Sequence, residues 1–207
     1  MILDIKRQDS YSRGELLTRT FFGFLYIGIP HIFVMYFVGI YVSIMNFIAW
    51  WVILFTGKYP KSTFDLMIKF QSWGIRLNAS MSNLIDGYPE IGLEGSHPNV
   101  TYSVNYPENV SRGGLILKAM FGMIYCIFPH IFVLMFRAMA GAFLGMIAWW
   151  AILFTGEYPE SWFKFQVGTM IWSQRISVYM GHMEDNYPPF SGKSDQELGR
   201  DQSAPQQ

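Results

Sequence analysis

Residues 20–57 read TFFGFLYIGIPHIFVMYFVGIYVSIMNFIAWWVILFTG and contain no Asp, Glu, Lys or Arg. A second stretch, residues 119–156, reads AMFGMIYCIFPHIFVLMFRAMAGAFLGMIAWWAILFTG and holds a single charge, Arg137. An apolar run of about 18 residues is already long enough for a transmembrane helix. Buried helices of soluble proteins are rarely this long and usually keep a polar face. The two stretches therefore predict a membrane protein.

The remaining composition excludes several classes of protein. Fifteen Lys and Arg residues balance fifteen Asp and Glu residues, so the formal net charge is zero. Nucleic acid is not expected as a partner, because phosphate binding needs a basic excess or a basic patch. Cys126 is the single cysteine. An internal disulfide framework and a multi-cysteine metal site are thus excluded.

The two apolar stretches belong to a direct repeat with a constant offset of 99 residues and no gap. Such self-similarity identifies a structural unit that is used twice. The positions that recur are interpreted as a structural motif. They are Pro30, His31, Trp50, Trp51, Gly57, Tyr59, Pro60, Trp73 and Arg76 in the first copy, and Pro129, His130, Trp149, Trp150, Gly156, Tyr158, Pro159, Trp172 and Arg175 in the second.

Length arithmetic favours a helical hairpin within each apolar stretch, residues 20–57 and 119–156. As one helix, roughly 37 residues would reach about 55 Å, against a hydrocarbon core of about 30 Å. A single span would also place Arg137 at the bilayer centre, where a charge is costly. Small residues near Val38-Gly39 and in 140–142 suit a tight turn at each tip. A re-entrant hairpin that does not fully cross is the alternative.

Hairpins place 14 of the 15 basic residues on one side of the membrane, with Arg137 on the other. The positive-inside rule then makes that side cytoplasmic. We therefore expect a multi-pass protein with both termini in the cytoplasm. The aromatic residues near the end of each apolar stretch are typical of an interfacial belt.

An amphipathic helix is predicted after each hairpin, over residues 62–86 and 161–185. Apolar side chains recur there at helical spacing among charged ones, so the helix is too polar to span and is expected along the cytoplasmic interface. Packing on a partner subunit is the alternative. The sequence thus predicts an all-α membrane protein with a first repeat over 1–98, a second over 99–191, and a disordered polar tail over 192–207.

Four sequence motifs carry a resemblance to a known family. They are the Pro-His pair followed by a hydrophobic run and Ile-Ala-Trp-Trp-x-Ile-Leu-Phe-Thr-Gly-x-Tyr-Pro in both copies, Trp-x-x-Arg, and Asp-x-Tyr-Pro-Pro-Phe at 185–190. The chain resembles a bacterial membrane domain known only as a domain of unknown function, which occurs in one or two copies per chain. The resemblance implies a bacterial integral membrane protein and supplies no catalytic residues to carry over. We expect it in the inner membrane. The first copy departs from the pattern at Glu90 and Ile91.

His31 and His130 are the sharpest candidates for a functional site, because ionisable residues within apolar helices are costly. Each follows a proline, which leaves the carbonyl four residues earlier without its usual donor. A neutral imidazole could satisfy backbone or side-chain groups there. Contact with a lipid or partner is a second interpretation. Ligation of a haem by both histidines is a third. We predict no metal and no cofactor, although lipid contacts are expected.

No nucleophile–base set or phosphate-binding loop recurs in the two copies, so we expect no enzymatic activity. The predicted function is an accessory or scaffold subunit of a larger membrane complex, with lipids and a membrane-protein partner or a second copy as its contacts. A small transporter or channel component built from repeats is the alternative. A haem-binding subunit is a more distant one.

Overall fold

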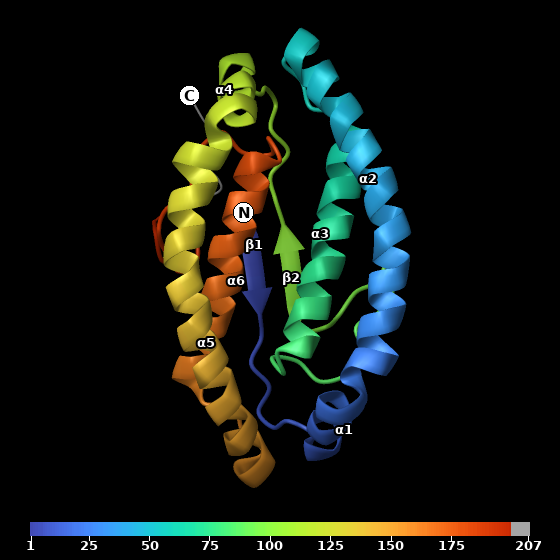
Figure 1. The fold of residues 1–207 in the computed structure, drawn as a ribbon, viewed down its shortest axis with the longest axis vertical. Helices are drawn as coiled ribbons and strands as arrows, with labels where there is room; N and C mark the ends of the chain where they lie inside the picture. The colour runs from blue at the N-terminus through green and yellow to red at the C-terminus, as the bar shows by residue number, and fades with distance from the viewer. Residues whose placement is uncertain (200–207) are drawn as a thin grey trace.

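The computed structural model describes residues 1–199, which form four helices and a two-stranded sheet (Figure 1). Two helices of 44 residues, Arg13–Thr56 and Arg112–Thr155, each contain a π-helical turn. Two shorter helices follow them. The elements are β1 (Ile2–Ile5), α1 (Arg13–Gly23), η1 (Phe24–Gly28), α2 (Ile29–Thr56), α3 (Lys61–Met81), β2 (Val100–Ser103), α4 (Arg112–Gly122), η2 (Met123–Ile127), α5 (Phe128–Thr155) and α6 (Glu160–Met180).

Both long helices have sequence-encoded ends. Ser12 and Ser111 are the N-caps, and their hydroxyls accept from backbone N–H groups of the first turn. Gly57 and Gly156 end the helices with φ of 72° and 80°. Glycine is favoured there because a side chain would be strained in the left-handed conformation.

The all-α class and the two tandem repeats are confirmed, but the hairpin within each apolar stretch is not found. Residues 38–39 and 140–142 lie inside α2 and α5 without a turn. Their small side chains instead permit close helix packing. Phe70 of α3 lies 3.6 Å from the Cβ position of Gly39. In the second repeat the Gln166 amide donates to the Gly141 carbonyl at 2.6 Å.

Arg137 also lies in the middle of a helix, not at a hairpin tip. Its Nε donates to Thr169 Oγ1 at 2.8 Å and its Nη2 to the Phe165 carbonyl at 3.1 Å. The guanidinium carbon lies 4.2 Å from the centroid of the Phe165 ring. The charge is therefore turned towards α6.

The predicted amphipathic helices correspond to α3 and α6, which end earlier than expected. Asn83 and His182, at equivalent positions, have φ of 57° and 60° and end the helical conformation. Both helices pack against the long helix of their own repeat, α3 on α2 and α6 on α5.

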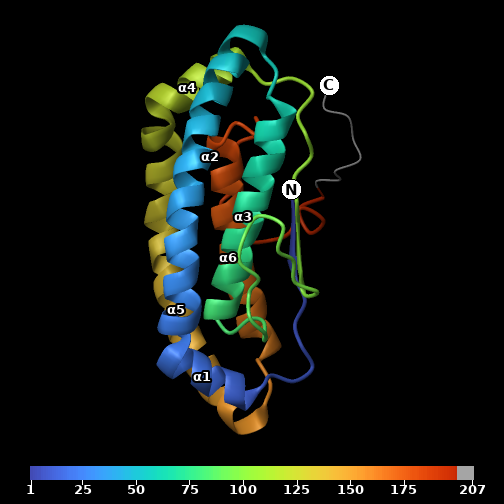
Figure 2. The same cartoon turned by 90° about the vertical axis from the view of Figure 1, so that its right-hand side faces the viewer.

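The elements form three layers. Figure 2 shows α2 and α5 on one side, α3 and α6 in the middle, and the strand pair on the other side. The long helices are antiparallel, and each begins beside the end of the other (Figure 1). At one such junction Trp149 Nε1 donates to Thr20 Oγ1 at 2.8 Å. At the other, Val110 N donates to the Gly57 carbonyl at 2.8 Å. The two repeats thus interlock and share one core.

The sheet joins the N-terminal strand to the segment between the repeats. β1 and β2 are antiparallel, with Ile2 opposite Ser103 and Ile5 opposite Val100. The Met1 ammonium then pairs with Asp195 at 2.9 Å, and Arg175 pairs with the same carboxylate at 2.6 Å. Residues 192–199 of the tail predicted to be disordered are therefore partly packed, and residues 200–207 lie outside the described part.

The burial of His182 predicts that the stability of this fold depends on pH. Burial, with the nearby Lys118 ammonium, lowers the pKa of His182 to about 4. In the unfolded chain it takes up a proton below about pH 6.5, so acidification from there to pH 4 favours unfolding. We expect a loss of up to about 3 kcal/mol at pH 4, from about 1.4 kcal/mol per pKa unit.

The test is thermal unfolding in detergent between pH 7 and pH 4. Replacing His182 by asparagine is a matched change, because Asn83 holds the equivalent left-handed position. H182N should reduce the pH dependence over this interval, and the part due to the other buried histidines should remain. An unchanged pH dependence in H182N would contradict the assignment.

Candidate functional site

The largest surface feature is an apolar face along the two long helices. Among the described residues, 35 of the 42 exposed large hydrophobic side chains lie on these helices, 18 on the first and 17 on the second. On α2 they recur at helical spacing, as in Ile29, Ile32, Phe33, Tyr36 and Phe37. This spacing places them on one side of the helix.

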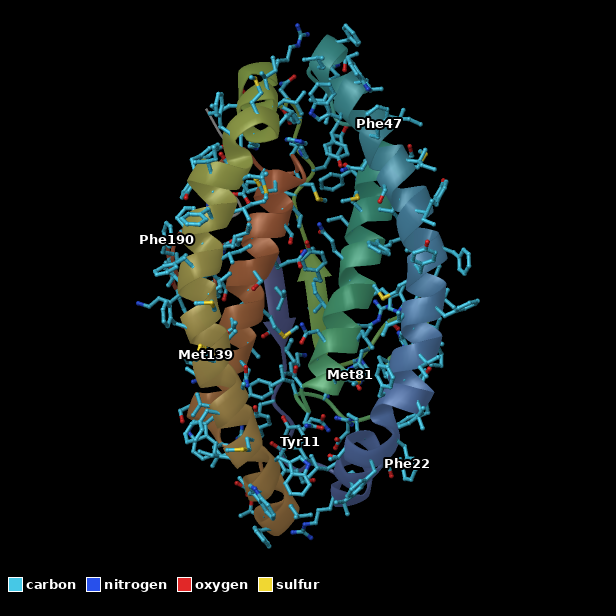
Figure 3. All side chains as sticks on the ribbon, viewed as in Figure 1. Tyr11, Phe22, Phe47, Met81, Met139 and Phe190 are labelled. Atoms are coloured by element: carbon cyan, nitrogen blue, oxygen red, sulfur yellow. The ribbon has the colours of Figure 1, made fainter. Side chains whose placement is uncertain are left out.

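Figure 3 shows Phe22, Phe47 and Met139 on the outer side of the long helices. The two helices are long and apolar enough to cross a membrane, by length and composition. Soluble monomers rarely expose continuous apolar patches of this extent. We call this surface the apolar face; it comprises the exposed hydrophobic side chains of α1, η1, α2, α4, η2 and α5.

The two intrahelical histidines point the other way, into the protein. Trp73 Nε1 donates to His31 Nδ1 at 2.8 Å, and Trp172 Nε1 donates to His130 Nδ1 at the same distance. Both histidines are completely buried. Because an indole N–H is only a donor, each Nδ1 is the acceptor and the neutral imidazole carries its proton on Nε2. We call each of these contacts a His–Trp pair.

The Asp-x-Tyr-Pro segment covers each His–Trp pair. Tyr88 lies beside His31 with ring centroids 5.5 Å apart, and Tyr187 lies beside His130 at 5.3 Å. In the second repeat Phe190 stacks on His130 at 3.9 Å with an interplanar angle of 9°. The first repeat has Ile91 at that position, so its histidine lacks this stack.

The proline before each histidine explains the π-helical turn. Proline has no N–H and clashes with the carbonyl four residues earlier in a regular helix. The chain widens here instead, so Phe128 N bonds the Met123 carbonyl five residues back. The Tyr125 carbonyl, four residues before Pro129, accepts from the Tyr187 hydroxyl at 3.0 Å. The segment after α6 therefore satisfies a backbone group that proline cannot.

Trp-x-x-Arg does not form the cation–π pair that its spacing allows. The tryptophan binds the histidine, and the arginine binds the segment after the short helix. Arg76 Nη2 donates to the Gly92 carbonyl at 3.0 Å, and Arg175 Nη1 to the Ser191 carbonyl at 3.1 Å. Each Trp-x-x-Arg motif thus joins its short helix both to the long helix of the same repeat and to the segment that follows the short helix.

A buried cation at the start of each long helix was missed by the sequence reasoning. Arg19 donates to the carbonyls of Ser80 and Ile85, and Lys118 donates to the Glu184 carbonyl and to Asp185. Asp86 also accepts from Ser12 N, as Asp185 does from Ser111 N. The sequence repeat could have indicated these residues, because Arg19 and Lys118 are separated by the 99-residue offset. Asp86 and Asp185 are separated by the same offset.

The remaining motif residues connect the helices. Tyr59 and Tyr158 follow the helix-ending glycines and are buried, so they are not part of an interfacial belt. Pro60 and Pro159 occupy the N-cap positions of α3 and α6. Trp51 and Trp150 are exposed on the apolar face, whereas their neighbours Trp50 and Trp149 are half-buried.

The structure does not bring His31 and His130 together. α2 and α5 begin towards opposite ends of the molecule, and each histidine is held by the tryptophan of its own repeat (Figure 1). The geometry needed for ligation of one haem by both imidazoles is therefore not formed. The described residues also contain no group of three or more His, Cys, Asp or Glu side chains that could hold a metal.

A cavity of about 490 Å³ lies between the two repeats. Amide and hydroxyl side chains of α3 and α6 line it together with apolar groups of α2 and α5. Tyr102 of β2 joins its two walls: the hydroxyl donates to Gln71 Oε1 at 2.6 Å and accepts from Gln174 Nε2 at 2.9 Å. The strand pair thus cross-links α3 to α6.

Removing the donor of one His–Trp pair should destabilise the protein. W73F keeps most of the ring volume but leaves His31 Nδ1 buried without a partner, which costs about 1–3 kcal/mol. The free energy of unfolding in detergent measures this. The matched control is W51F on the apolar face, where we expect a change within about 0.5 kcal/mol.

A double variant separates the hydrogen bond from the packing. H31L combined with W73F removes both hydrogen-bonding partners. The double variant should therefore lose less free energy of unfolding than the sum of the losses in the two single variants. If the effects of H31L and W73F on the free energy of unfolding simply add, the result would contradict a specific hydrogen bond between His31 and Trp73.

Comparison with known proteins places the chain in a family. A family model described as a domain of unknown function (DUF4389) matches residues 18–90 and 118–192, more than half of the chain. The searches with this chain found no matching curated protein and no matching solved structure. The chain therefore belongs to the family described as a domain of unknown function (DUF4389), and it carries two tandem copies of that domain.

Proposed function

We propose that this protein is a non-enzymatic scaffold or accessory subunit of a larger assembly at the bacterial inner membrane. The apolar face is the observation that carries the proposal. It follows both long helices from end to end, and no charged residue interrupts the sequence between Arg19 and Lys58. An apolar patch of this extent is typical of a surface that contacts a membrane or another protein.

The use of the buried polar groups supports a role without chemistry or a cofactor. Arg19 and Lys118 bind the segments that follow the short helices, and the His–Trp pairs hold the short helices on the long ones. Each group is engaged in joining two parts of the fold. A general acid or base must come within hydrogen-bond reach of its substrate, and these groups are buried within the protein.

The polar surface supports contact with other proteins on the cytoplasmic side. Exposed residues of opposite charge on the short helices form ion pairs, such as Lys61 with Asp65 and Lys164 with Glu160. A mixed and locally neutralised surface suits a protein partner or a second copy better than a polyanion. The basic residues off the apolar face favour the anionic cytoplasmic leaflet.

A transporter or channel component is the second candidate, because of the cavity between the repeats. Its amide and hydroxyl lining would suit a neutral solute. The Tyr102 contacts to Gln71 and Gln174 favour the scaffold, since they tie both walls of the cavity to the strand pair. A glycerol flux in proteoliposomes above that of empty vesicles would favour transport instead.

The assembly is tested on the full chain in its native membrane. We expect the protein to stay with the membrane in high salt and to be released by mild detergent. The released particle should have a fixed mass well above the 24.0 kDa of one chain. Release as a soluble protein without detergent would contradict membrane seating. A monomer at every detergent concentration would contradict the scaffold role.

A further inference from the structure

The length of the apolar face does not match the thickness of a bilayer. Exposed apolar side chains extend from Leu17 to Phe55 on the first helix. At 1.5 Å per residue this is about 57 Å, nearly twice the hydrocarbon core of about 30 Å. Because α1 bends away from α2 at the π-helical turn (Figure 2), the straight part of the stripe is Ile29–Phe55, about 39 Å long. To bury that part while crossing, α2 would have to tilt by about 40°, the upper limit of the usual 0–40°, and α1 would remain as a further apolar segment.

The charges at the middle of the molecule also disfavour crossing. Lys69 and Glu94 form an exposed ion pair at 2.5 Å. They lie at mid-length, because Phe70, next to Lys69, contacts the long helix at Gly39. The N-terminus lies at mid-length too (Figure 1), where the Met1 ammonium binds Asp195. In a crossing orientation these charges would lie at the bilayer centre.

The order of the layers separates these charges from the apolar face. The strand pair and the N-terminus lie on the side opposite α2 and α5 (Figure 2). The short helices lie between the two sides. One broad surface of the molecule is therefore apolar, and the opposite surface carries the N-terminus and the sheet.

We propose that the protein lies parallel to the membrane within one leaflet, with the acyl chains of that leaflet covering the apolar face. The inference rests on the proposed membrane seating and replaces the crossing expected from the sequence. The occupant is lipid. Interfacial helices insert their apolar sides roughly 5–10 Å below the headgroups, which suits a stripe one helix deep.

The arrangement of the repeats supports this orientation. The long helices are antiparallel and lie in the same layer, so a pseudo-two-fold axis through the layers relates the two repeats (Figures 1 and 2). In the membrane plane both copies present the same surface to the same leaflet. In a crossing orientation, the equivalent ends at Arg13 and Arg112 would face opposite sides of the membrane.

Depth measurements by site-directed spin labelling test the orientation. Cys126 is buried and is replaced by alanine. Single cysteines then replace Phe22, Phe37 and Phe55, which are all exposed along one stripe. Lys69→Cys is the matched control, at mid-length but off the apolar face. The labelled full chain is placed in phosphatidylethanolamine–phosphatidylglycerol vesicles, and broadening by oxygen and by a water-soluble nickel chelate is compared.

We expect labels at 22, 37 and 55 at similar depths of roughly 5–10 Å, and the label at 69 in water. Shielding at 37 and 69, with 22 and 55 in water, would overturn the proposal in favour of crossing while leaving membrane seating intact. Shielding of the stripe from both reagents, with spin–spin broadening, would replace lipid by a second copy. Labels in water at all positions would refute the membrane seating itself.

Discussion

The hydrogen bond from a tryptophan indole to a buried histidine, made once in each repeat, is the contact on which the structure depends. Each long helix contains one imidazole in a charge-poor apolar sequence. The indole N–H satisfies Nδ1 from inside the protein, so the imidazole is turned away from the apolar face. The same bond holds α3 on α2 and α6 on α5. Separation of the apolar and polar surfaces follows from it.

The buried cations extend this separation to the helix ends. Arg19 and Lys118 lie within the first turns of the long helices, where an exposed charge would interrupt the apolar face. Carbonyl and carboxylate groups from the end of α3 and from the segments after α3 and α6 surround them instead. The Asp86 and Asp185 carboxylates also accept from the N-caps of the long helices. One local arrangement thus starts the helix and hides its charge.

Much of this architecture could be predicted from the sequence. The 99-residue offset and the charge-free stretches predict two helical repeats, and Gly57 and Gly156 mark the helix ends. Whether each apolar stretch forms one continuous helix or a hairpin could not be predicted from the sequence. Small residues at 38–39 and 140–142 are compatible with a turn or with close packing, and only the positions of Phe70 and Gln166 decide between them.

The contacts of the candidate site were harder to predict than its residues. His31 and Trp73 were both singled out by the repeat, yet their pairing is a tertiary contact between residues 42 positions apart. His130 and Trp172 are also 42 positions apart, and this recurrence could have suggested that each histidine pairs with the tryptophan of its own repeat. The orientation of the molecule also needed tertiary information, because periodicity places side chains on a helix face but does not show what lies behind the helix.

α2, α3, α5 and α6 run near the long axis of the molecule, whereas α1 and α4 bend away from it (Figures 1 and 2), so one orientation describes most of the helical structure. Polarised infrared spectroscopy of the full chain in aligned bilayers measures that orientation from the amide I dichroism. An average helix axis close to the membrane plane, near 90° from the normal, is the result expected for a protein that lies within one leaflet. An average axis within the 0–40° of spanning helices would contradict it.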